Sequence, residues 1–198
     1  MTKTSFKLTP EIQAERADMA ARGEDGNVVP SPMGAEQFLP KEEVDVQMGG
    51  AGLYSCARDY TKLLSALLQT PSPLFKEKET LEWAFQPCLT PQSRKGMNDI
   101  LFGAFGAMFS GGALPTEGIE VDYSMAGLSV LGGLEGRRAG AGKAIQWGGL
   151  PNLLWCVDRE KGKAVFYGSQ ILPPGDQKSG EAFAKFEALI FGGEGSKL

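Results

Sequence analysis

The sequence predicts an α+β fold, with helical segments in the first part of the chain and an antiparallel sheet with a C-terminal helix in the second. Apolar residues recur at helical spacing shortly after position 55, which indicates an amphipathic helix. Three apolar stretches between positions 143 and 171 are short, and the connections between them are too short for crossovers. Neighbouring strands are therefore expected to pair antiparallel.

The first 48 residues predict little regular structure. A short helix is expected over residues 10–22, because proline suits the first helical turn and Thr9 can cap it. Residues 24–27 form a turn cluster, and two valines beside prolines at 28–32 predict an extended segment. Residues 33–48 are polar and are predicted to be loop.

The clearest predicted helix follows a glycine-rich approach at 49–54. Ser55 is expected to be its N-cap, and Asp59 falls in the early turns, where the helix dipole favours an acidic side chain. Its apolar face consists of Tyr60, Leu63, Leu64, Leu67 and Leu68. Pro71 and Pro73 end this helix.

Three further segments precede the strands. A second helix is expected over residues 76–85, with Leu81, Trp83 and Ala84 partly buried. Residues 89–97 are expected to be irregular. Residues 103–112 are apolar and rich in glycine, which predicts a loop that covers another part of the protein.

From residue 120 the pattern is that of strands. Four are expected, at 121–131 with a break near Gly127, at 143–148, at 153–157 and at 164–171. Residues 158–163 contain Gly162 and predict a hairpin turn. A last helix is expected over 180–191, with Phe183, Phe186, Leu189 and Ile190 facing inward.

The composition excludes several kinds of chemistry. The chain of 198 residues contains no histidine, which removes Ser-His-Asp and Cys-His catalysis and nearly all zinc hydrolases. With 20 basic and 24 acidic residues and no basic run, it has no electrostatic footprint for nucleic acid or an anionic membrane. The carboxylates, including those of the expected hairpin tip at 158–161, are interpreted as mostly solvated surface. No metal and no cofactor is predicted.

The three cysteines, Cys56, Cys88 and Cys156, are odd in number and far apart in sequence. This spacing fits neither a zinc site nor a disulfide framework, so buried, reduced thiols are expected.

Residues 1–10 are polar and do not resemble a signal peptide, and no stretch is apolar enough for a membrane span. The expected location is therefore cytoplasmic.

Three short motifs are weak on inspection. The turn at 140–143 resembles a phosphate loop but lacks the glycine at its start and the hydroxyl residue after the lysine. Ser55 and Arg58 have the spacing of a serine with its general base, but arginine stays protonated and cannot be that base. Tyr123 is followed two residues later by Met125 rather than by an asparagine, and a packed strand residue is the favoured interpretation.

The segment 147–152, Trp-Gly-Gly-Leu-Pro-Asn, is the most informative one. A strand that ends in two glycines exposes backbone N–H groups, which can stabilise an oxyanion, and the tryptophan offers a flat apolar wall for a ligand. The alternative is a strand edge with a buried tryptophan. The pattern alone favours that alternative.

Three segments, 49–60, 146–159 and 170–176, resemble in order and spacing the C-terminal part of the β-lactamase-related serine hydrolases. This family includes class C β-lactamases, D-Ala-D-Ala carboxypeptidase-like proteins, and fungal esterases and transesterases of the lovastatin-acyltransferase type. The resemblance implies an incomplete β-lactamase/transpeptidase-like fold. Residues 1–118 would form part of the helical lobe with its loops, and 119–198 the antiparallel strands and C-terminal helix of the α/β lobe.

The resemblance also assigns a site. Trp147, Gly148 and Gly149 match the family's third motif, and the N–H of Leu150 would be one of two oxyanion donors. In the family the other donor belongs to the nucleophilic serine of a Ser-x-x-Lys motif, which lies upstream of the matched region together with a Tyr-x-Asn motif. No catalytic residue is therefore assigned within this chain, and a truncated enzyme is expected.

Two functions follow as expectations. The first is a truncated serine hydrolase or acyltransferase that transfers an acyl group from an ester or thioester, in the setting of fungal secondary metabolism. The second is a non-catalytic pseudoenzyme or a binding and interaction module. Loss of the first strands of the sheet would leave an inner strand at an edge, so self-association or a complementary polypeptide is the expected partner.

Overall fold

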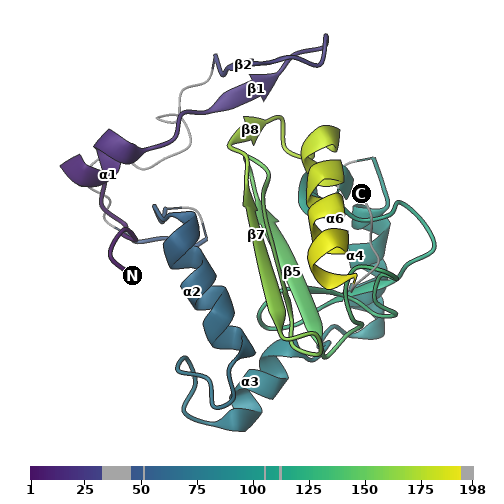
Figure 1. Ribbon diagram of the computed structural model, residues 1–198. Helices are drawn as coiled ribbons and strands as arrows, with labels where there is room; N and C mark the ends of the chain where they lie inside the picture. The colour runs from purple at the N-terminus through teal and green to yellow at the C-terminus, as the bar shows by residue number, and fades with distance from the viewer. Residues whose placement is uncertain (33–45, 51, 105, 112, 193–198) are drawn as a thin grey trace.

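The computed structural model describes residues 1–32, 46–50, 52–104, 106–111 and 113–192. Its centre is an antiparallel sheet of five strands in the order β3-β4-β5-β6-β7. Helix α2 (Ala57–Leu68) packs on one face of this sheet and α6 (Gln177–Phe191) on the other (Figure 1). The expected α+β architecture, with an antiparallel sheet and a C-terminal helix, is confirmed.

The N-terminal segment forms a short helix and then a hairpin. Helix α1 (Pro10–Glu15) is capped by Thr9, as expected, but it ends well before residue 22. The reason is that β1 (Ala20–Arg22) pairs with β2 (Val28–Pro30) and runs parallel to β8 (Ile171–Leu172) in a second sheet. Of the loop predicted at 33–48, residues 33–45 lie outside the described residues.

Helix α2 buries the apolar face that the sequence predicts for it. Leu64 and Leu67 are buried, while Asp59 lies in the first turn and accepts a hydrogen bond from the Lys3 backbone N–H at 2.7 Å. The predicted cap is wrong: Cys56 is the N-cap residue, and Ser55 instead shares a hydrogen bond with the Thr4 hydroxyl.

The next helices differ more from expectation. In α3 (Lys78–Phe85), Leu81 and Ala84 are buried as expected, but Trp83 is 65% exposed. The prediction of an irregular segment at 89–97 is wrong, because α4 (Pro91–Leu101) occupies it, with Thr90 accepting a hydrogen bond from the Ser93 N–H. Within the predicted loop at 103–112 the structure contains the short helix α5 (Gly106–Ser110).

The five-stranded sheet is built from sequential hairpins. Its strands are β3 (Val121–Tyr123), β4 (Leu128–Val130), β5 (Ala144–Gly149), β6 (Leu153–Asp158) and β7 (Lys163–Gly168). The strand predicted at 121–131 is two strands, because the chain reverses at 124–127 and β3 pairs antiparallel with β4. The hairpin predicted at 158–163 is present, and its strands pair from Asp158 with Lys163 to Leu153 with Gly168.

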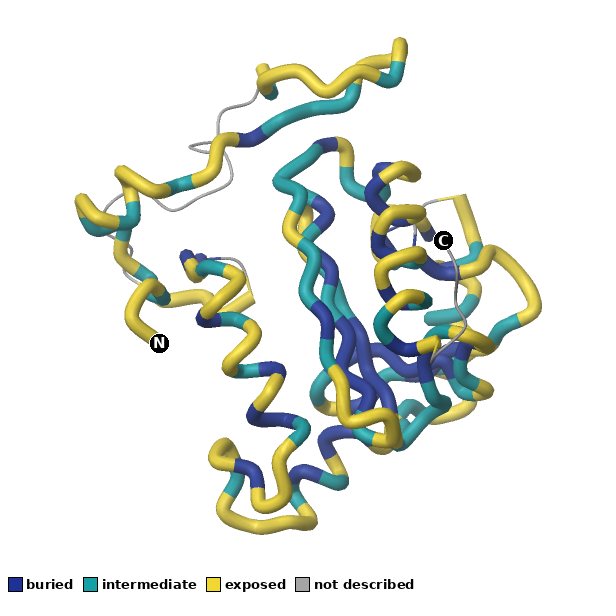
Figure 2. Tube along the Cα trace, viewed as in Figure 1, coloured by how far each residue is buried: buried dark blue, intermediate teal, exposed yellow. Residues whose placement is uncertain are grey.

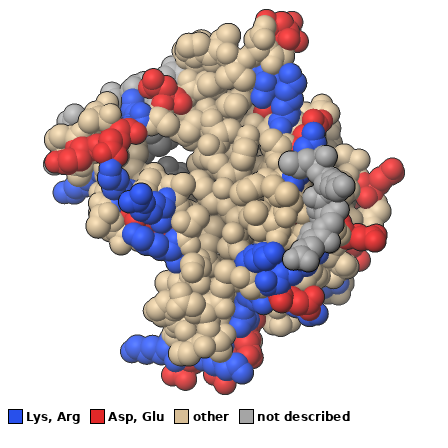
Figure 3. Space-filling view, viewed as in Figure 1, with Lys and Arg blue, Asp and Glu red and all other residues tan. Residues whose placement is uncertain are grey.

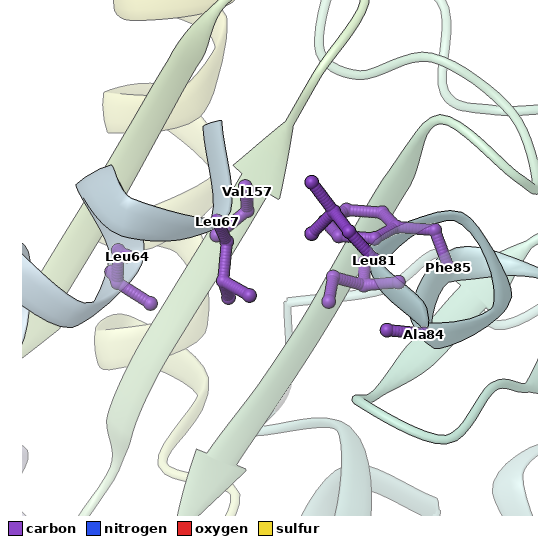
Figure 4. Close-up of a cluster of buried hydrophobic side chains, with 7 residues drawn as sticks. Leu64, Leu67, Leu81, Ala84, Phe85 and Val157 are labelled. Atoms are coloured by element: carbon purple, nitrogen blue, oxygen red, sulfur yellow. The ribbon is translucent and has the colours of Figure 1, made fainter. Parts of the chain in front are cut away.

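The main core lies between α2, α3 and one face of the sheet. Leu64 and Leu67 of α2 and Leu81 and Phe85 of α3 meet over the strand that carries Val157 (Figure 4). Buried residues follow the strands and the sides of the helices that face them, whereas in the β1–β2 hairpin β1 is half-buried and β2 is exposed (Figure 2). Residues before and after position 118, the expected boundary between the two lobes, therefore share this core.

The opposite face of the sheet is covered by α6. Phe183 and Phe191 pack there against Cys156 and Val165. The inward set predicted for this helix is partly wrong: Phe183 and Ile190 face the core, but Phe186 and Leu189 are 37% and 47% exposed. The sequence prediction chose apolar residues only, whereas the helix turns a fully buried glutamate, Glu187, toward the sheet.

Two expectations about polar residues also need correction. Cys156 is buried and all three cysteines are free, but Cys88 is exposed and Cys56 is half-buried. Asp158 is not solvated: it is fully buried and accepts hydrogen bonds from the backbone N–H groups of Ala139 and Lys161.

Among the described helices, none has the length and apolar character that a membrane span requires.

Candidate functional site

The segment predicted to bind substrate lies at the exposed end of strand β5. Trp147 pairs with Trp155, Gly148 with Leu154 and Gly149 with Leu153 across the β5–β6 hairpin. The ladder stops at Gly149, and the chain then turns through residues 150–152. The structure therefore brings the four predicted residues together at one corner of the sheet, with Leu150 at 44% exposure.

Trp147 is held by an aromatic neighbour that the sequence could not assign. The rings of Tyr123 and Trp147 meet edge to face, with centroids 5.2 Å apart and planes at 87°. Burial raises the pKa of the Tyr123 phenol, and both rings pack against the cluster around Leu128. Trp147 is half-buried, so its ring packs in the core and still contributes surface, and its role as a ligand wall stays a prediction.

Packing requires glycine at one of the two glycine positions of the motif but not at the other. A Cβ at Gly148 would lie 2.7 Å from Leu154 Cδ2 and 3.0 Å from the Leu153 carbonyl oxygen. A Cβ at Gly149 would meet nothing closer than 3.7 Å. Close packing of β5 on β6 therefore requires glycine at position 148, whereas position 149 is open toward the exposed end of the strand.

The turn after the glycines is fixed by Asn152. This residue has a left-handed backbone, with φ of 56°, and is almost fully buried. Its side-chain amide donates to the carbonyl oxygens of Ile171 at 2.7 Å and Pro173 at 2.8 Å, and its Oδ1 accepts from the Gly175 N–H at 2.9 Å. One side chain thus ties the turn to the segment that follows β7.

Ser169 adds a second tie. Its hydroxyl donates to the carbonyl oxygens of Pro151 and Asn152, at 3.0 and 3.2 Å, and the Ile171 N–H bonds to Pro151 as well. Sequence analysis did not single out Ser169 or the role of Asn152. The available signal was an asparagine after Gly-Gly-Leu-Pro, since asparagine tolerates a left-handed backbone better than most residues.

The turn is therefore rigid while the N–H of Leu150 stays unused. Among the hydrogen bonds between described residues, none has this N–H as its donor. A fixed N–H at an exposed strand end is the kind of donor that stabilises a negatively charged oxygen, because it needs little reorganisation when the charge develops.

A buried charged network supports the same strand from behind. Arg138 donates to the side-chain oxygen of Gln146, the residue before Trp147, and at 2.8 Å to Glu187 of α6. Arg137 donates to Glu187 and, at 2.9 Å, to the Ala113 carbonyl; burial lowers the pKa of Arg137. Sequence analysis missed this network, because its members are far apart in the chain.

Of the three weaker motifs, the turn at 140–143 and the Ser55–Arg58 pair form no site, whereas Tyr123 packs against Trp147. The turn at 140–143 precedes β5, and Lys143 pairs with Glu160 at the surface. Within the described part of the chain, no hydrogen bond joins a serine hydroxyl to a lysine amine, and no group of acidic residues and cysteines has metal-binding geometry. The assignment of no catalytic residue stays a prediction.

Comparison with known proteins identifies relatives of this arrangement. No family model matches the chain. The ML-236A carboxylate methylbutanoyltransferase of Penicillium citrinum is 27% identical over 193 residues, and the monacolin J acid methylbutanoyltransferase of Aspergillus terreus is 27% identical over 194. Each match covers 96% of this chain but only 44% and 45% of the relative, so the chain spans less than half the length of these proteins.

A solved structure agrees with these matches. The unliganded simvastatin synthase LovD from Aspergillus terreus superposes with a TM-score of 0.84 at 27% identity. The superposition covers all of this chain and 48% of that one. The arrangement of strands and helices described above is therefore found as one part of a larger protein.

Proposed function

We propose that this chain supplies one wall of an acyl-transfer site. The premise is that the chain is homologous to fungal acyltransferases of the LovD type and shares their β-lactamase-like fold over the part that it covers. Trp147, Gly148, Gly149 and Leu150 form this wall. The observation that carries the proposal is the turn after β5, which Asn152 and Ser169 tie down while no hydrogen bond between described residues uses the N–H of Leu150.

The chemistry assigned to this wall is stabilisation of an oxyanion. A hydroxyl nucleophile adds to the carbonyl carbon of an ester or thioester, and the carbonyl oxygen becomes negatively charged in the tetrahedral intermediate. The N–H of Leu150 donates to that oxygen, and a donor of this kind contributes about 10²–10³ in rate. The intermediate then expels the alcohol or thiol, which leaves the acyl group on the nucleophile for an acceptor hydroxyl.

The substrate class follows from the same surface. The half-buried ring of Trp147, braced by Tyr123, offers an apolar wall beside the proposed donor. Apolar walls with one or two well-placed polar groups are typical of small-molecule sites. The proposed substrate is therefore an apolar acyl ester or thioester, and the nucleophile and its base come from a segment outside this sequence.

A backbone substitution tests this assignment. Turnover of p-nitrophenyl butyrate is measured for the chain combined with the part of the Aspergillus terreus acyltransferase that this chain does not match. Leu150→Pro removes the N–H and is expected to lower kcat by about 100-fold or more. Leu150→Ala keeps the N–H and is the matched control, expected to lose far less. If both variants are equally active and equally stable, the donor is not Leu150.

The second candidate is a non-catalytic acyl-binding module. It is supported by one observation: among the described residues, no hydrogen bond joins a serine hydroxyl to a lysine amine. In a Trp83→Phe, Trp155→Phe background, Trp147 is the remaining tryptophan. Quenching of its fluorescence by a butyryl thioester, with no turnover in the combined assay above, would identify this function.

Two further expectations are carried as proposals. We propose a cytoplasmic, reducing location, because all three cysteines are free thiols. Non-reducing mass spectrometry of protein from its source should find no disulfide. The division into a partial helical lobe at 1–118 and an α/β lobe at 119–198 also stays a proposal, to be tested by limited proteolysis near residue 118.

A further inference from the structure

The end of strand β5 has a neighbouring strand on one side only. Strand β4 begins at Leu128, which pairs with Gln146, so residues 147–149 extend beyond it. Among the described strands, β6 is the one that pairs with this last part of β5. The turn that follows carries the N–H of Leu150, so the position of this donor depends on what else holds the end of β5.

The side chain of Gln146 lies at the last position where β5 has strands on both sides. It is 5% exposed and lies on the face of the sheet that α6 covers. This follows because cross-strand partners share a face, and its partner Cys156 packs against Phe183 of α6. The next side chain, Trp147, points to the opposite face. Gln146 is therefore on the α6 side of the sheet, one residue before the motif.

Arg138 joins this glutamine to α6. Its guanidinium donates one hydrogen bond to Gln146 Oε1 and a second, at 2.8 Å, to the Glu187 carboxylate. Many charged side chains lie at the surface in Figure 3, but Arg138 and Glu187 are only 4% and 0% exposed. Helix α6 runs along the same sheet in Figure 1. The three side chains thus tie β5 to the helix that covers this face.

The arginine is itself fixed. The main chains of Leu134 and Arg138 bond to each other in both directions, at 2.9 and 3.0 Å, which closes the turn that carries Arg138. Glu187 is also held by Arg137, whose Nε donates to its carboxylate at 3.0 Å. The link from Gln146 to α6 therefore has a defined geometry at each of its members.

Stability by itself does not account for this arrangement. Buried ion pairs contribute little compared with apolar side chains of similar volume. Among the described residues, Arg138 Nε and Glu187 Oε1 are buried without a hydrogen-bond partner, which adds a cost. The residues beside Gln146 across the sheet, Cys156 and Val165, belong to the hydrophobic core, so an apolar side chain would fit the same row. What the polar link adds is one fixed position for the strand.

We propose that Arg138 is a positioning residue, which acts through Gln146 to fix the end of β5 and with it the N–H of Leu150. The inference rests on the proposed function, because the group that is placed is the oxyanion donor. Asn152 and Ser169 fix the turn toward the segment after β7, and Arg138 fixes the strand that leads into this turn.

The effect of Arg138 is on geometry. Leu150 lies four residues beyond Gln146, about 13 Å along an extended strand, so the guanidinium is too distant to bond to the oxyanion. A displacement of about 1 Å at a reacting group can nevertheless lower a rate about 100-fold. Loss of the link is therefore expected to appear in kcat.

Two measurements on Gln146→Met test the proposal, because this variant removes the acceptor and keeps the length of the side chain. In the whole chain alone, ¹⁵N order parameters at residues 147–150 should be about 0.85 and should fall to about 0.7 or less in the variant. In the combined assay with p-nitrophenyl butyrate, kcat should fall about tenfold or more while KM stays within about twofold. Gln146→Glu keeps an acceptor at the same place and should restore both values.

Ser129→Ala is the matched control. Ser129 is 1% exposed, and its hydroxyl donates to the Ala144 carbonyl at 3.0 Å, so it holds the opposite end of β5. Its removal should lower stability without an effect on kcat or on the order parameters of residues 147–150.

A double variant, Arg138→Met with Gln146→Met, separates positioning from stability. Glu187 keeps its bond from Arg137, so the two methionines remove the link without leaving a buried charge unpaired. Urea unfolding should show a folded protein. The strand end should still be mobile, and kcat should be as low as in Gln146→Met.

The proposal is overturned if Gln146→Met leaves kcat or the order parameters of residues 147–150 unchanged, or if Ser129→Ala lowers kcat as much. A rise in KM at constant kcat would also overturn it, because Gln146 would then act on ground-state binding. Equal activity of Leu150→Pro and Leu150→Ala would instead contradict the proposed function. In that case the order parameters decide whether Arg138 fixes the strand end.

Discussion

Replacement of Gly148 by alanine should destabilise the β5–β6 hairpin, whereas the same change at Gly149 should not. The Cβ at position 148 would lie 2.7 Å from Leu154 Cδ2 and 3.0 Å from a backbone oxygen. Neither neighbour can move freely, because Leu154 is only 3% exposed and the oxygen belongs to the adjacent strand. Overpacking of this kind costs about 1–3 kcal/mol.

The net effect includes the unfolded chain. Alanine has fewer unfolded conformations than glycine, which stabilises a compatible site by about 0.4–1 kcal/mol. Gly148→Ala should therefore lower the free energy of unfolding by about 1–2 kcal/mol, or Tm by about 2–8 °C for a chain of this size. At Gly149 the nearest atom is 3.7 Å away and φ is not left-handed, so only the small gain remains.

Thermal unfolding followed by circular dichroism, with urea unfolding as a second measurement, distinguishes the two variants. Their midpoints should differ in the stated direction at equal protein concentration. Equal midpoints for Gly148→Ala and Gly149→Ala would refute the steric argument, and the glycine at 148 would then need another explanation, such as access for a ligand to the backbone.

Three further outcomes are expected. Glu187→Gln should lower the free energy of unfolding by about 3–5 kcal/mol, measured in urea, because it leaves two buried arginines without their counter-charge; a loss below about 1 kcal/mol would contradict this. The hydrogen bond from Arg22 lowers the pKa of Asp176 to about 2. About 1 kcal/mol of folding stability should therefore be present above pH 4 and be lost as the pH falls toward 2. The Asp176→Asn variant should not show this pH-dependent loss of stability. A thiol reagent should modify exposed Cys88 in the native protein and leave Cys156 intact, because burial raises the pKa of the Cys156 thiol; modification of both at one rate, by mass spectrometry, would refute it.

Local patterns in the sequence were sufficient for much of the fold. The period of the apolar residues in α2, the turn residues between β6 and β7, and the short connections between strands each act over a few neighbouring residues. Helix α4 was missed because its sequence is mostly polar and its apolar residues, Met97, Ile100 and Leu101, come only in the last turns, although its cap, Thr90 followed by proline, was present.

For the candidate site, the sequence placed Trp147–Leu150 at a strand end, and the structure agrees. It could not show what holds that corner. Tyr123, Asn152 and Ser169 act on it from three other segments, and each is an ordinary residue in its own local pattern. Contacts between distant segments leave no trace in local spacing.

The sequence by itself therefore determined the class of the fold, the antiparallel pairing of the neighbouring strands after residue 120 and the place of the Trp-Gly-Gly motif, because these depend on local periodicity and turn chemistry. Only the tertiary structure decided that Glu187 faces inward and that the Asn98 side chain closes the β3 edge of the sheet through its bonds to the main chain of Val121. Burial of a charge depends on arginines about 50 positions away in the chain, and closure of an edge depends on one asparagine on a separate helix. Both are settled by which partners the folded chain brings within hydrogen-bonding distance.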